Sequence, residues 1–199
     1  MIKLLKGKKN NDNGILSNSH IILSNSYIID NIVIDAPENL EPPSNIVKLI
    51  ITHEHCDHFI GADNFNCKKY SHPFTKDSIN NKKDECCLCK YVGYKFPNIK
   101  IDYELKDGET IENLKVFYTP GHSKGSICLY EPNKKILFSG DTVFSNYNLP
   151  RTDLLTSEPD KLLDSYEKLS NLEIDIIYPG HGEKIKEKDY IKKLIQFLQ

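Results

Sequence analysis

Hydrophobic and polar residues alternate in short blocks near the start of the chain, and this pattern predicts strands. Residues 26–30 and 32–35 are predicted to form a hairpin that turns at Asp30-Asn31. After a proline-containing loop, residues 46–51 (Ile-Val-Lys-Leu-Ile-Ile) form a nearly continuous apolar run rich in β-branched residues. Such a run is typical of a strand that is buried on both faces. It ends at Thr52, directly before a cluster of histidines.

Extended and helical patterns are mixed over the rest of the chain. Residues from about 73 to 91 are predicted to be helical, and Asp107-Gly108 is typical of a hairpin turn. Amphipathic helices are predicted at 159–169 and 190–198, because apolar side chains recur there at spacings of three and four. Further strands are predicted at 115–119, 126–130, 136–139 and 174–178. Strands mixed with helices predict an α/β domain with covered sheets.

Length and charge narrow the class of protein. The 199 residues fit one domain, predicted to span 1–199, with a sizeable core. The formal net charge of −2 gives no basic surface for nucleic acid or for an anionic membrane. No apolar run is long enough to cross a bilayer, and the first six residues have too short an apolar stretch for a signal peptide. We therefore expect a cytoplasmic protein with a small-molecule substrate; the sequence gives no indication of its oligomeric state.

The histidine cluster after the buried strand carries most of the chemical information. It reads His53-Glu54-His55-Cys56-Asp57-His58. In extended backbone alternate side chains share a face, so His53, His55 and Asp57 are predicted to point together off the strand end. If the chain then turns into a helix, His58 reaches the same cavity. Imidazole suits zinc and related metals, and a carboxylate can join it as an oxygen ligand.

Three later segments each place one ligand type in a tight, glycine-containing turn after a predicted strand. They are Pro120-Gly121-His122, Gly140-Asp141-Thr142 and Pro179-Gly180-His181. Loops at strand ends are common positions for functional residues on a rigid scaffold. Five of the 7 histidines fall in the four motifs, so His20 and His72 are interpreted as ordinary surface or core histidines.

The order of these motifs resembles the metallo-β-lactamase superfamily from about residue 26 to the end of the chain. Gly140-Asp141-Thr142-Val143-Phe144 followed by Arg151-Thr152-Asp153-Leu154 looks most like its glyoxalase II-like branch. The resemblance implies a four-layer αβ/βα sandwich with two metal ions at one edge. Zinc is the expected metal, with iron or manganese as alternatives. By resemblance, His53, His55 and His122 hold the first metal, Asp57, His58 and His181 hold the second, and Asp141 bridges the two.

This arrangement predicts a metal-dependent hydrolase. Two divalent ions would lower the pKa of a shared water, and the resulting hydroxide is expected to attack a carbonyl carbon, with a phosphorus as the alternative. Asp57 and Asp141 are the predicted catalytic carboxylates, Asp57 because it can also orient the nucleophile. A small ester, thioester or lactone is the expected substrate, since little chain after His181 is available to grip glutathione. The alternatives are a sulfur dioxygenase with one iron and a non-catalytic metal-binding scaffold.

Two features admit a structural or a functional interpretation. Six cysteines in a cytosolic chain are expected to be mostly reduced, with Cys56 packing as a small apolar side chain. The pair Cys86 and Cys89, with Cys67 upstream, is interpreted as free thiols, the alternative being a structural zinc site. Arg151 either binds an anionic substrate group or pairs with a carboxylate.

Overall fold

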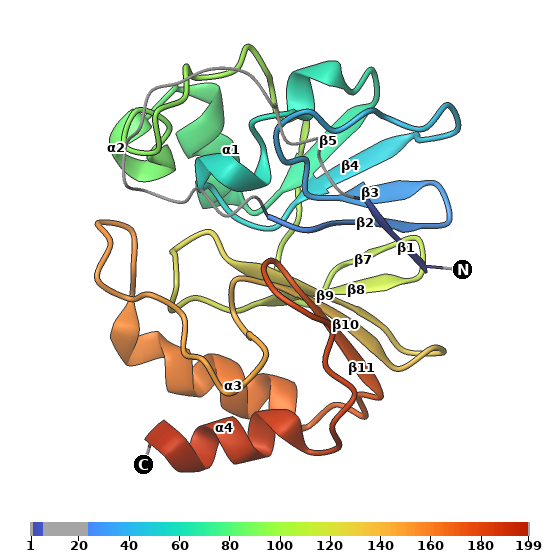
Figure 1. Cartoon of the computed structure of the whole chain (residues 1–199), viewed down its shortest axis with the longest axis vertical. Coiled ribbons are helices and arrows are strands. Elements are labelled where there is room, and N and C mark those ends of the chain that lie inside the picture. The colour runs from blue at the N-terminus through green and yellow to red at the C-terminus, as the bar shows by residue number, and fades with distance from the viewer. Residues whose placement is uncertain (1, 6–23, 199) are drawn as a thin grey trace.

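Two mixed β-sheets lie face to face in the computed structural model, which describes residues 2–5 and 24–198 (Figure 1). In the first sheet the strand order is β1-β2-β3-β4-β5-β6, and in the second it is β11-β10-β9-β8-β7. The first sheet comprises β1 (Ile2–Leu5), β2 (Ser26–Ile29), β3 (Ile32–Ile34), β4 (Lys48–Ile51), β5 (Lys68–Ser71) and β6 (Tyr103–Glu104). The second comprises β7 (Thr110–Ile111), β8 (Leu114–Tyr118), β9 (Ile127–Glu131), β10 (Ile136–Gly140) and β11 (Ile176–Pro179).

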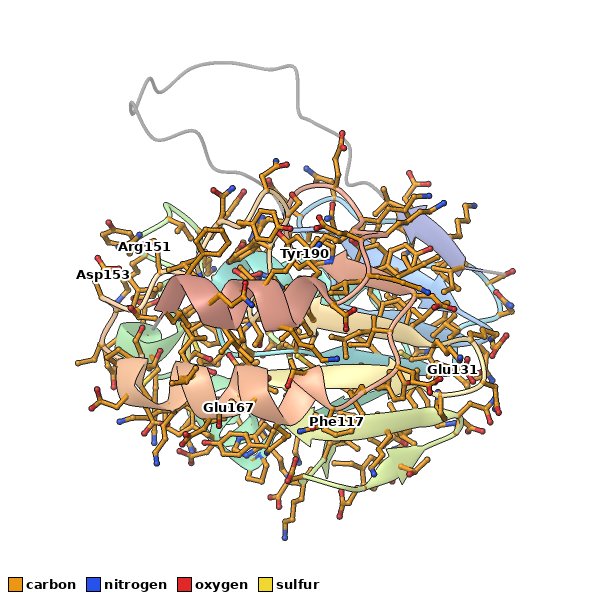
Figure 2. All side chains as sticks on the ribbon, turned by 90° about the horizontal axis from the view of Figure 1, so that it is seen from below. Phe117, Glu131, Arg151, Asp153, Glu167 and Tyr190 are labelled. Atoms are coloured by element: carbon orange, nitrogen blue, oxygen red, sulfur yellow. A yellow bond between two sulfur atoms is a disulfide. The ribbon has the colours of Figure 1, made fainter. Side chains whose placement is uncertain are left out.

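Helices cover the outer face of each sheet. The helices α1 (Pro73–Asn80) and α2 (Asp84–Cys87) lie over the first sheet, and α3 (Leu162–Ser170) and α4 (Tyr190–Leu198) lie over the second (Figure 1). Figure 2 shows α3 and α4 side by side across the outer face of the second sheet. The short 3₁₀ turns are η1 (Cys56–His58), η2 (Ala62–Asn64) and η3 (Pro159–Lys161). The predicted four-layer αβ/βα sandwich is therefore confirmed.

Three apolar cores separate these four layers. The central core lies between the sheets and includes Ile50, Ile127 and Phe138. A second core lies between the first sheet and its helices, and a third lies between the second sheet and α3 and α4. Because β4 faces two cores, Leu49, Ile50 and Ile51 are all fully buried. This double burial explains why the strand has a continuous apolar sequence.

Most predicted elements are confirmed, and the boundaries of the buried strands are within two residues. The hairpin of β2 and β3 turns at Asp30, which has a φ of 54°. The predicted helix over 73–91 is two short helices, because Lys82 and Leu88 adopt positive φ angles of 50° and 62°. The strand β1 was not predicted; it pairs with β2 at the sheet edge.

The hairpin predicted at Asp107-Gly108 is wrong. These residues follow β6 of the first sheet and precede β7 of the second, so they carry the chain from one sheet to the other. The hairpin in this region joins β7 to β8, and Glu112 at its turn has a φ of 52°. The sequence pattern identified a turn correctly but not the strands that it joins.

No helix among the described residues is long and apolar enough to cross a membrane.

Candidate metal centre

The seven predicted ligands come together at one edge of the sandwich, where strands of both sheets end. His53 comes shortly after the end of β4, and Asp141 comes directly after β10. His181 is separated from the end of β11 by Gly180. Backbone hydrogen bonds fix these ends to one another: Ile127 N–H donates to Thr52 C=O at 2.9 Å, and Gly180 N–H donates to Gly140 C=O at 2.7 Å. Gly140 has a φ of 48°, a conformation that favours glycine, and it directs Asp141 into the site.

His53, His55 and His122 form the first group of donors. The Nε2 atom of His53 lies 3.1 Å from Nδ1 of His55, and that Nδ1 atom lies 2.9 Å from Nε2 of His122. All three side chains are buried. Three imidazole nitrogens that converge in this way form a ligand set suited to zinc and other borderline metals.

Asp57, His58 and His181 form the second group. The Oδ2 atom of Asp57 lies 3.0 Å from Nε2 of His181 and 3.5 Å from Nε2 of His58. The two Nε2 atoms are 3.3 Å apart. His58 enters the group because η1 turns the chain directly after the extended segment, as the sequence predicted for a helical turn.

Asp141 reaches both groups. One carboxylate oxygen, Oδ1, lies 3.2 Å from Nε2 of His58. The other, Oδ2, lies 3.6 Å from Nε2 of His122 and 3.5 Å from Nε2 of His181. Its carboxylate therefore stands between the two groups of donors.

The outer nitrogens of three histidines have hydrogen-bond acceptors that fix their tautomers. His122 Nδ1–H donates to the Arg151 carbonyl at 2.8 Å, and His58 Nδ1–H donates to the Asp35 carboxylate at 2.8 Å. The Thr52 hydroxyl donates its hydrogen to the same carboxylate at 2.8 Å. The oxygen of this hydroxyl can therefore accept a hydrogen bond from His53 Nδ1–H at 3.2 Å. Each Nε2 atom therefore presents a lone pair to the interior of the site.

Charge at the centre is arranged for a cation. Burial and the neighbouring histidines lower the pKa of His53 well below its ordinary value, and burial lowers that of His55 to about 3. Burial alone would raise the pKa of Asp141, but His181 and His58 outweigh it and hold the pKa well below the usual range. Against the effect of burial, the nearby carboxylates in turn raise the pKa of His58, and they raise that of His181 to about 10. Metal ligation requires neutral imidazoles, so a bound cation would have to displace the protons of these two residues.

Two buried polar atoms without a hydrogen-bond partner also indicate that these donors suit a divalent cation. The Oδ1 atom of Asp141 is buried and has no hydrogen-bond partner within the described residues, and the same holds for Nδ1 of His181. A buried carboxylate oxygen without a hydrogen-bond donor is costly unless a cation or water satisfies it. Three overlapping triads of these seven residues each keep their donor atoms within 4.8 Å of one another: His53, His55 and His122; His53, His58 and Asp141; Asp57, His58 and His181.

The comparisons with known proteins agree with this geometry. A family model described as the metallo-beta-lactamase superfamily matches residues 23–181. The chain belongs to this superfamily. The resemblance inferred from the motifs is thereby confirmed, and with it membership of a superfamily whose members are mostly metal-dependent hydrolases.

Relatives within the superfamily include named hydrolases. The chain is 33% identical over 150 residues to a probable metallo-hydrolase of Methanocaldococcus jannaschii, covering 68% of this chain and 69% of that protein. It is 27% identical to a hydroxyacylglutathione hydrolase of Francisella tularensis subsp. novicida, over 74% of this chain and 54% of the relative. It is 35% identical over 85 residues to a human acyl-coenzyme A thioesterase, over 41% of this chain and 28% of that protein. The chain thus spans about half or less of the length of the last two.

Solved structures of the superfamily share the fold. A B3 metallo-beta-lactamase, BLEG-1, superposes with a TM-score of 0.76 at 24% identity, covering 98% of this chain and 99% of that one. A protein crystallised in a di-iron-bound form gives a TM-score of 0.70 at 22% identity, over 84% and 92% of the two chains. At this level of identity the likeness shows the fold.

A cavity of about 630 Å³ opens over five of the seven donor residues. His55, Asp57, His122, Asp141 and His181 form its floor, and its walls are mostly apolar. The walls include Leu88, Tyr91, Val92, Phe144, Leu149 and Leu154, with Arg151 at the rim. Arg151 also pairs with Asp153 at 3.0 Å (Figure 2), so it has a carboxylate partner and also lines the cavity.

His72 lies outside the centre, as predicted. Its ring stacks on Tyr118 at 4.4 Å between centroids, and its Nδ1 atom caps α1 by accepting from Phe74 N–H at 3.3 Å. His20 lies outside the described residues.

Several residues that support the centre were not identified from the sequence. Asn25 secures the His181 turn, because its side-chain amide donates to the carbonyls of Pro179 and Gly182 at 3.1 and 2.9 Å. Glu54 is fully buried beneath the histidines and accepts from Thr75 and Ser123 at 3.2 and 3.1 Å. Burial raises the pKa of Glu54 to about 7 despite these hydrogen bonds.

The most direct support comes from Asp35, which follows β3 and is 2% exposed. Its carboxylate accepts from Thr52 N–H, Thr52 Oγ1 and His58 Nδ1, each at 2.8 Å. Since β3 and β4 are parallel neighbours, their ends lie side by side. A signal was present in the sequence: an acidic residue directly after a buried strand.

We predict that Asp35→Asn weakens divalent-cation binding by about 10- to 100-fold, the usual cost of losing a group that orients a histidine ligand. The side-chain amide would present an N–H group to Thr52 and His58, whose hydrogen-bond donors the Asp35 carboxylate now accepts. Competition against a chromophoric chelator measures the affinity. Asp30→Asn is the matched control, because Asp30 is exposed and pairs with Lys134 at the surface, at 3.9 Å. Equal losses in the two variants would contradict the assigned role.

Proposed function

We propose that this chain is a dinuclear metal-dependent hydrolase that acts on a small ester, thioester or lactone with an apolar acyl group. The position of Asp141, with one oxygen near His58 and the other near His122 and His181, carries this proposal. One divalent cation would be held by His53, His55 and His122, the second by Asp57, His58 and His181, and both by Asp141.

Zinc fits a donor set of imidazole nitrogens and carboxylate oxygens, and iron or manganese accept the same donors. When bound, two such cations lower the pKa of water toward neutrality and stabilise negative charge on a carbonyl oxygen. The close assembly of the second group favours two cations over the single iron of a sulfur dioxygenase. The open cavity above the donors favours an enzyme over a scaffold.

Residues of the chain then orient the reactants. The Asp57 side chain is 20% exposed and lines the cavity, so its carboxylate would accept a hydrogen bond from the attacking water and direct the water oxygen at the carbonyl carbon. The C–S or C–O bond breaks, the proton lost by water passes to the departing thiol or alcohol, and a carboxylic acid remains. The apolar walls would receive the acyl group.

Thioesters are favoured candidates because two of the named relatives hydrolyse this bond according to their names. The walls offer apolar side chains and one cation at the rim, Arg151, which suits a compact acyl compound better than a polyanion. The net charge of −2 points the same way.

Metal analysis followed by a substrate comparison tests the proposal. After reconstitution with zinc we expect about two ions per chain, and then a higher kcat/KM for simple apolar thioesters or lactones than for lactoylglutathione or a phosphodiester. A protein that retains a single ion, or only iron, would support the dioxygenase. A preference for lactoylglutathione would overturn the small-substrate assignment, and a fully loaded protein without turnover would indicate a scaffold.

A further inference from the structure

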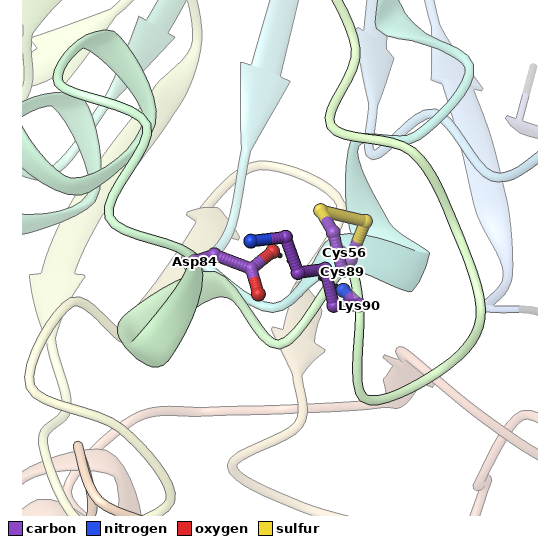
Figure 3. The surroundings of a disulfide bond; sticks show 4 residues. All are labelled: Cys56, Asp84, Cys89 and Lys90. Atoms are coloured by element: carbon purple, nitrogen blue, oxygen red, sulfur yellow. Dashed lines mark hydrogen bonds between the residues drawn. A yellow bond between two sulfur atoms is a disulfide. The ribbon is translucent and has the colours of Figure 1, made fainter.

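A disulfide bond joins η1, the turn over Cys56–His58, to a wall of the cavity. We call η1 the metal-binding turn. Cys56 stands between the predicted ligands His55 and Asp57, and its sulfur is bonded to that of Cys89 (Figure 3). The two residues are separated by 33 positions in the sequence. The expectation that Cys56 and Cys89 are free thiols is therefore wrong, whereas Cys67, Cys86, Cys87 and Cys128 are free. With Cys89 engaged in the disulfide, the structure gives no support to a zinc site at the Cys86–Cys89 pair.

Cys89 belongs to the segment that forms one wall of the cavity. Leu88, Tyr91 and Val92 of this segment line the cavity, as does Cys56 on the opposite side of the bond. The segment has neither helix nor strand between the end of α2 and the start of β6. We call residues 88–92 the disulfide-linked wall.

The hydrogen bonds of this wall close local turns. Val92 N–H donates to Leu88 C=O at 3.1 Å, and Tyr94 N–H donates to Cys89 C=O at 2.8 Å. Lys90 N–H donates to the Asp84 carboxylate at 3.1 Å, which ties the wall to α2 (Figure 3). These bonds shape the wall but do not attach it to the metal-binding turn, whereas the disulfide does.

The wall also reaches the far rim of the cavity. Tyr91 is 74% exposed and lines the cavity together with Arg151, which belongs to the loop that follows Asp141. Arg151 C=O in turn accepts from the ligand His122. The position of the wall therefore determines the shape of the cavity between the metal-binding turn and Arg151.

We propose that the Cys56–Cys89 disulfide is a redox-sensitive brace that holds the disulfide-linked wall in place and so sets the selectivity of the cavity for apolar acyl groups. The selectivity part rests on the proposed function. With the bond intact, Leu88 and Val92 form a fixed apolar surface beside the donors. With the bond reduced, the wall keeps its local turns and the packing of Cys89 and Val92 in the second apolar core, but it loses its covalent link to the metal-binding turn. We expect its contacts with a long acyl group to weaken as a result.

The redox step is an exchange with a dithiol. A thiolate of the reductant attacks one sulfur of the disulfide, the S–S bond breaks, and the other cysteine leaves as a thiolate that takes up a proton. The second thiol of the reductant then displaces the first cysteine and closes the reductant's own disulfide. Two electrons and two protons pass to the protein. Because Cys56 and Cys89 are 1% and 0% exposed, the wall must open before the attack, and we expect slow reduction.

The neighbouring thiols are poorly suited to exchange with this bond. Burial raises the pKa of Cys87 and, more weakly, that of Cys86. A thiol that stays protonated is a poor nucleophile, so the bond is expected to stay between Cys56 and Cys89 until an external dithiol acts.

Trypsin provides a test that does not depend on turnover. Lys90 and Lys95 are exposed in the irregular segment, and we expect cleavage after them to accelerate by about tenfold when the zinc-loaded protein is treated with dithiothreitol. Cys89→Ala should show the same fast cleavage without reductant. Cys67→Ala, which removes a free and partly exposed thiol, should behave as the wild type. Alkylation without reductant followed by peptide mapping must recover the Cys56–Cys89 linkage, and labelled Cys56 and Cys89 would overturn the proposal.

Kinetics with acyl thioesters of increasing chain length test selectivity. In the reduced protein and in Cys89→Ala, KM for the longest apolar chain should rise about tenfold, which is the loss expected for contacts with two methylene groups. The kcat for the shortest chain and the zinc content should stay near wild-type values.

Unchanged cleavage and unchanged chain-length dependence would overturn the brace. So would an equal loss for all chain lengths together with a loss of zinc. Absence of all turnover overturns the proposed function instead, and the trypsin comparison still decides on the brace.

Discussion

Replacing Asp141 by alanine is expected to abolish turnover and to lower the metal content of the protein. Its two oxygens face the two groups of donors, at 3.2 Å from His58 and at 3.6 Å from His122, so their removal weakens both cation sites at once. Stabilisation by a bound cation is worth several kcal/mol, and about 1.4 kcal/mol corresponds to a factor of ten. We therefore expect kcat/KM to fall by ~10³-fold or more. Elemental analysis and steady-state kinetics on the same preparation provide the measurement.

Two histidine variants, His53→Ala within the centre and His72→Ala outside it, test the ligand assignment. His53 contributes a donor to two of the three triads, so its loss should be nearly as damaging. His72 caps α1 and stacks on Tyr118, so His72→Ala should lower stability by about 1 kcal/mol and leave kcat/KM close to wild type. Equal damage from His72→Ala and His53→Ala would show that the ligand assignment is wrong.

The sequence predicted the parts of the centre that depend on local patterns. The apolar run ending at Thr52 identified a doubly buried strand, because burial on two faces requires apolar residues at successive positions. The spacing of His53, His55 and Asp57 then indicated a shared direction. Which donors belong to which cation site was implied by the family resemblance and stays a prediction. Two of the three donor triads match that division, and the third, formed by His53, His58 and Asp141, crosses it.

Contacts between distant segments could not be predicted in this way. Asp35 supports His58 only because β3 and β4 are parallel neighbours, and Asn25 supports the His181 turn across 154 to 157 positions of the chain. The Cys56–Cys89 bond likewise depends on how α2 and the following segment fold back over η1. Asp107-Gly108 has the composition of a hairpin turn, yet the chain passes between sheets there. Turn chemistry determines a local bend, whereas the partner strands depend on packing.

A methyl group added at Gly180 is expected to damage the centre without removing any ligand. A Cβ atom at this position would lie 2.2 Å from Asp141 Oδ1 and 2.7 Å from His58 Cε1. Both side chains are buried, so neither has free space into which it can move. Gly180 does not have a positive φ, so alanine brings no backbone strain and the effect is steric.

We expect Gly180→Ala to lower kcat/KM by ~10²-fold, because small misplacements of catalytic groups have costs of this order. We also expect it to weaken cation binding, measured by competition with a chelator. Gly108→Ala is the control: Gly108 has a φ of 80° and nothing within 4 Å of the added Cβ, so this variant should lose about 1 kcal/mol of stability and keep its metal and activity. If Gly180→Ala binds two ions with wild-type affinity, Asp141 does not stand between two cations, and the dinuclear assignment fails.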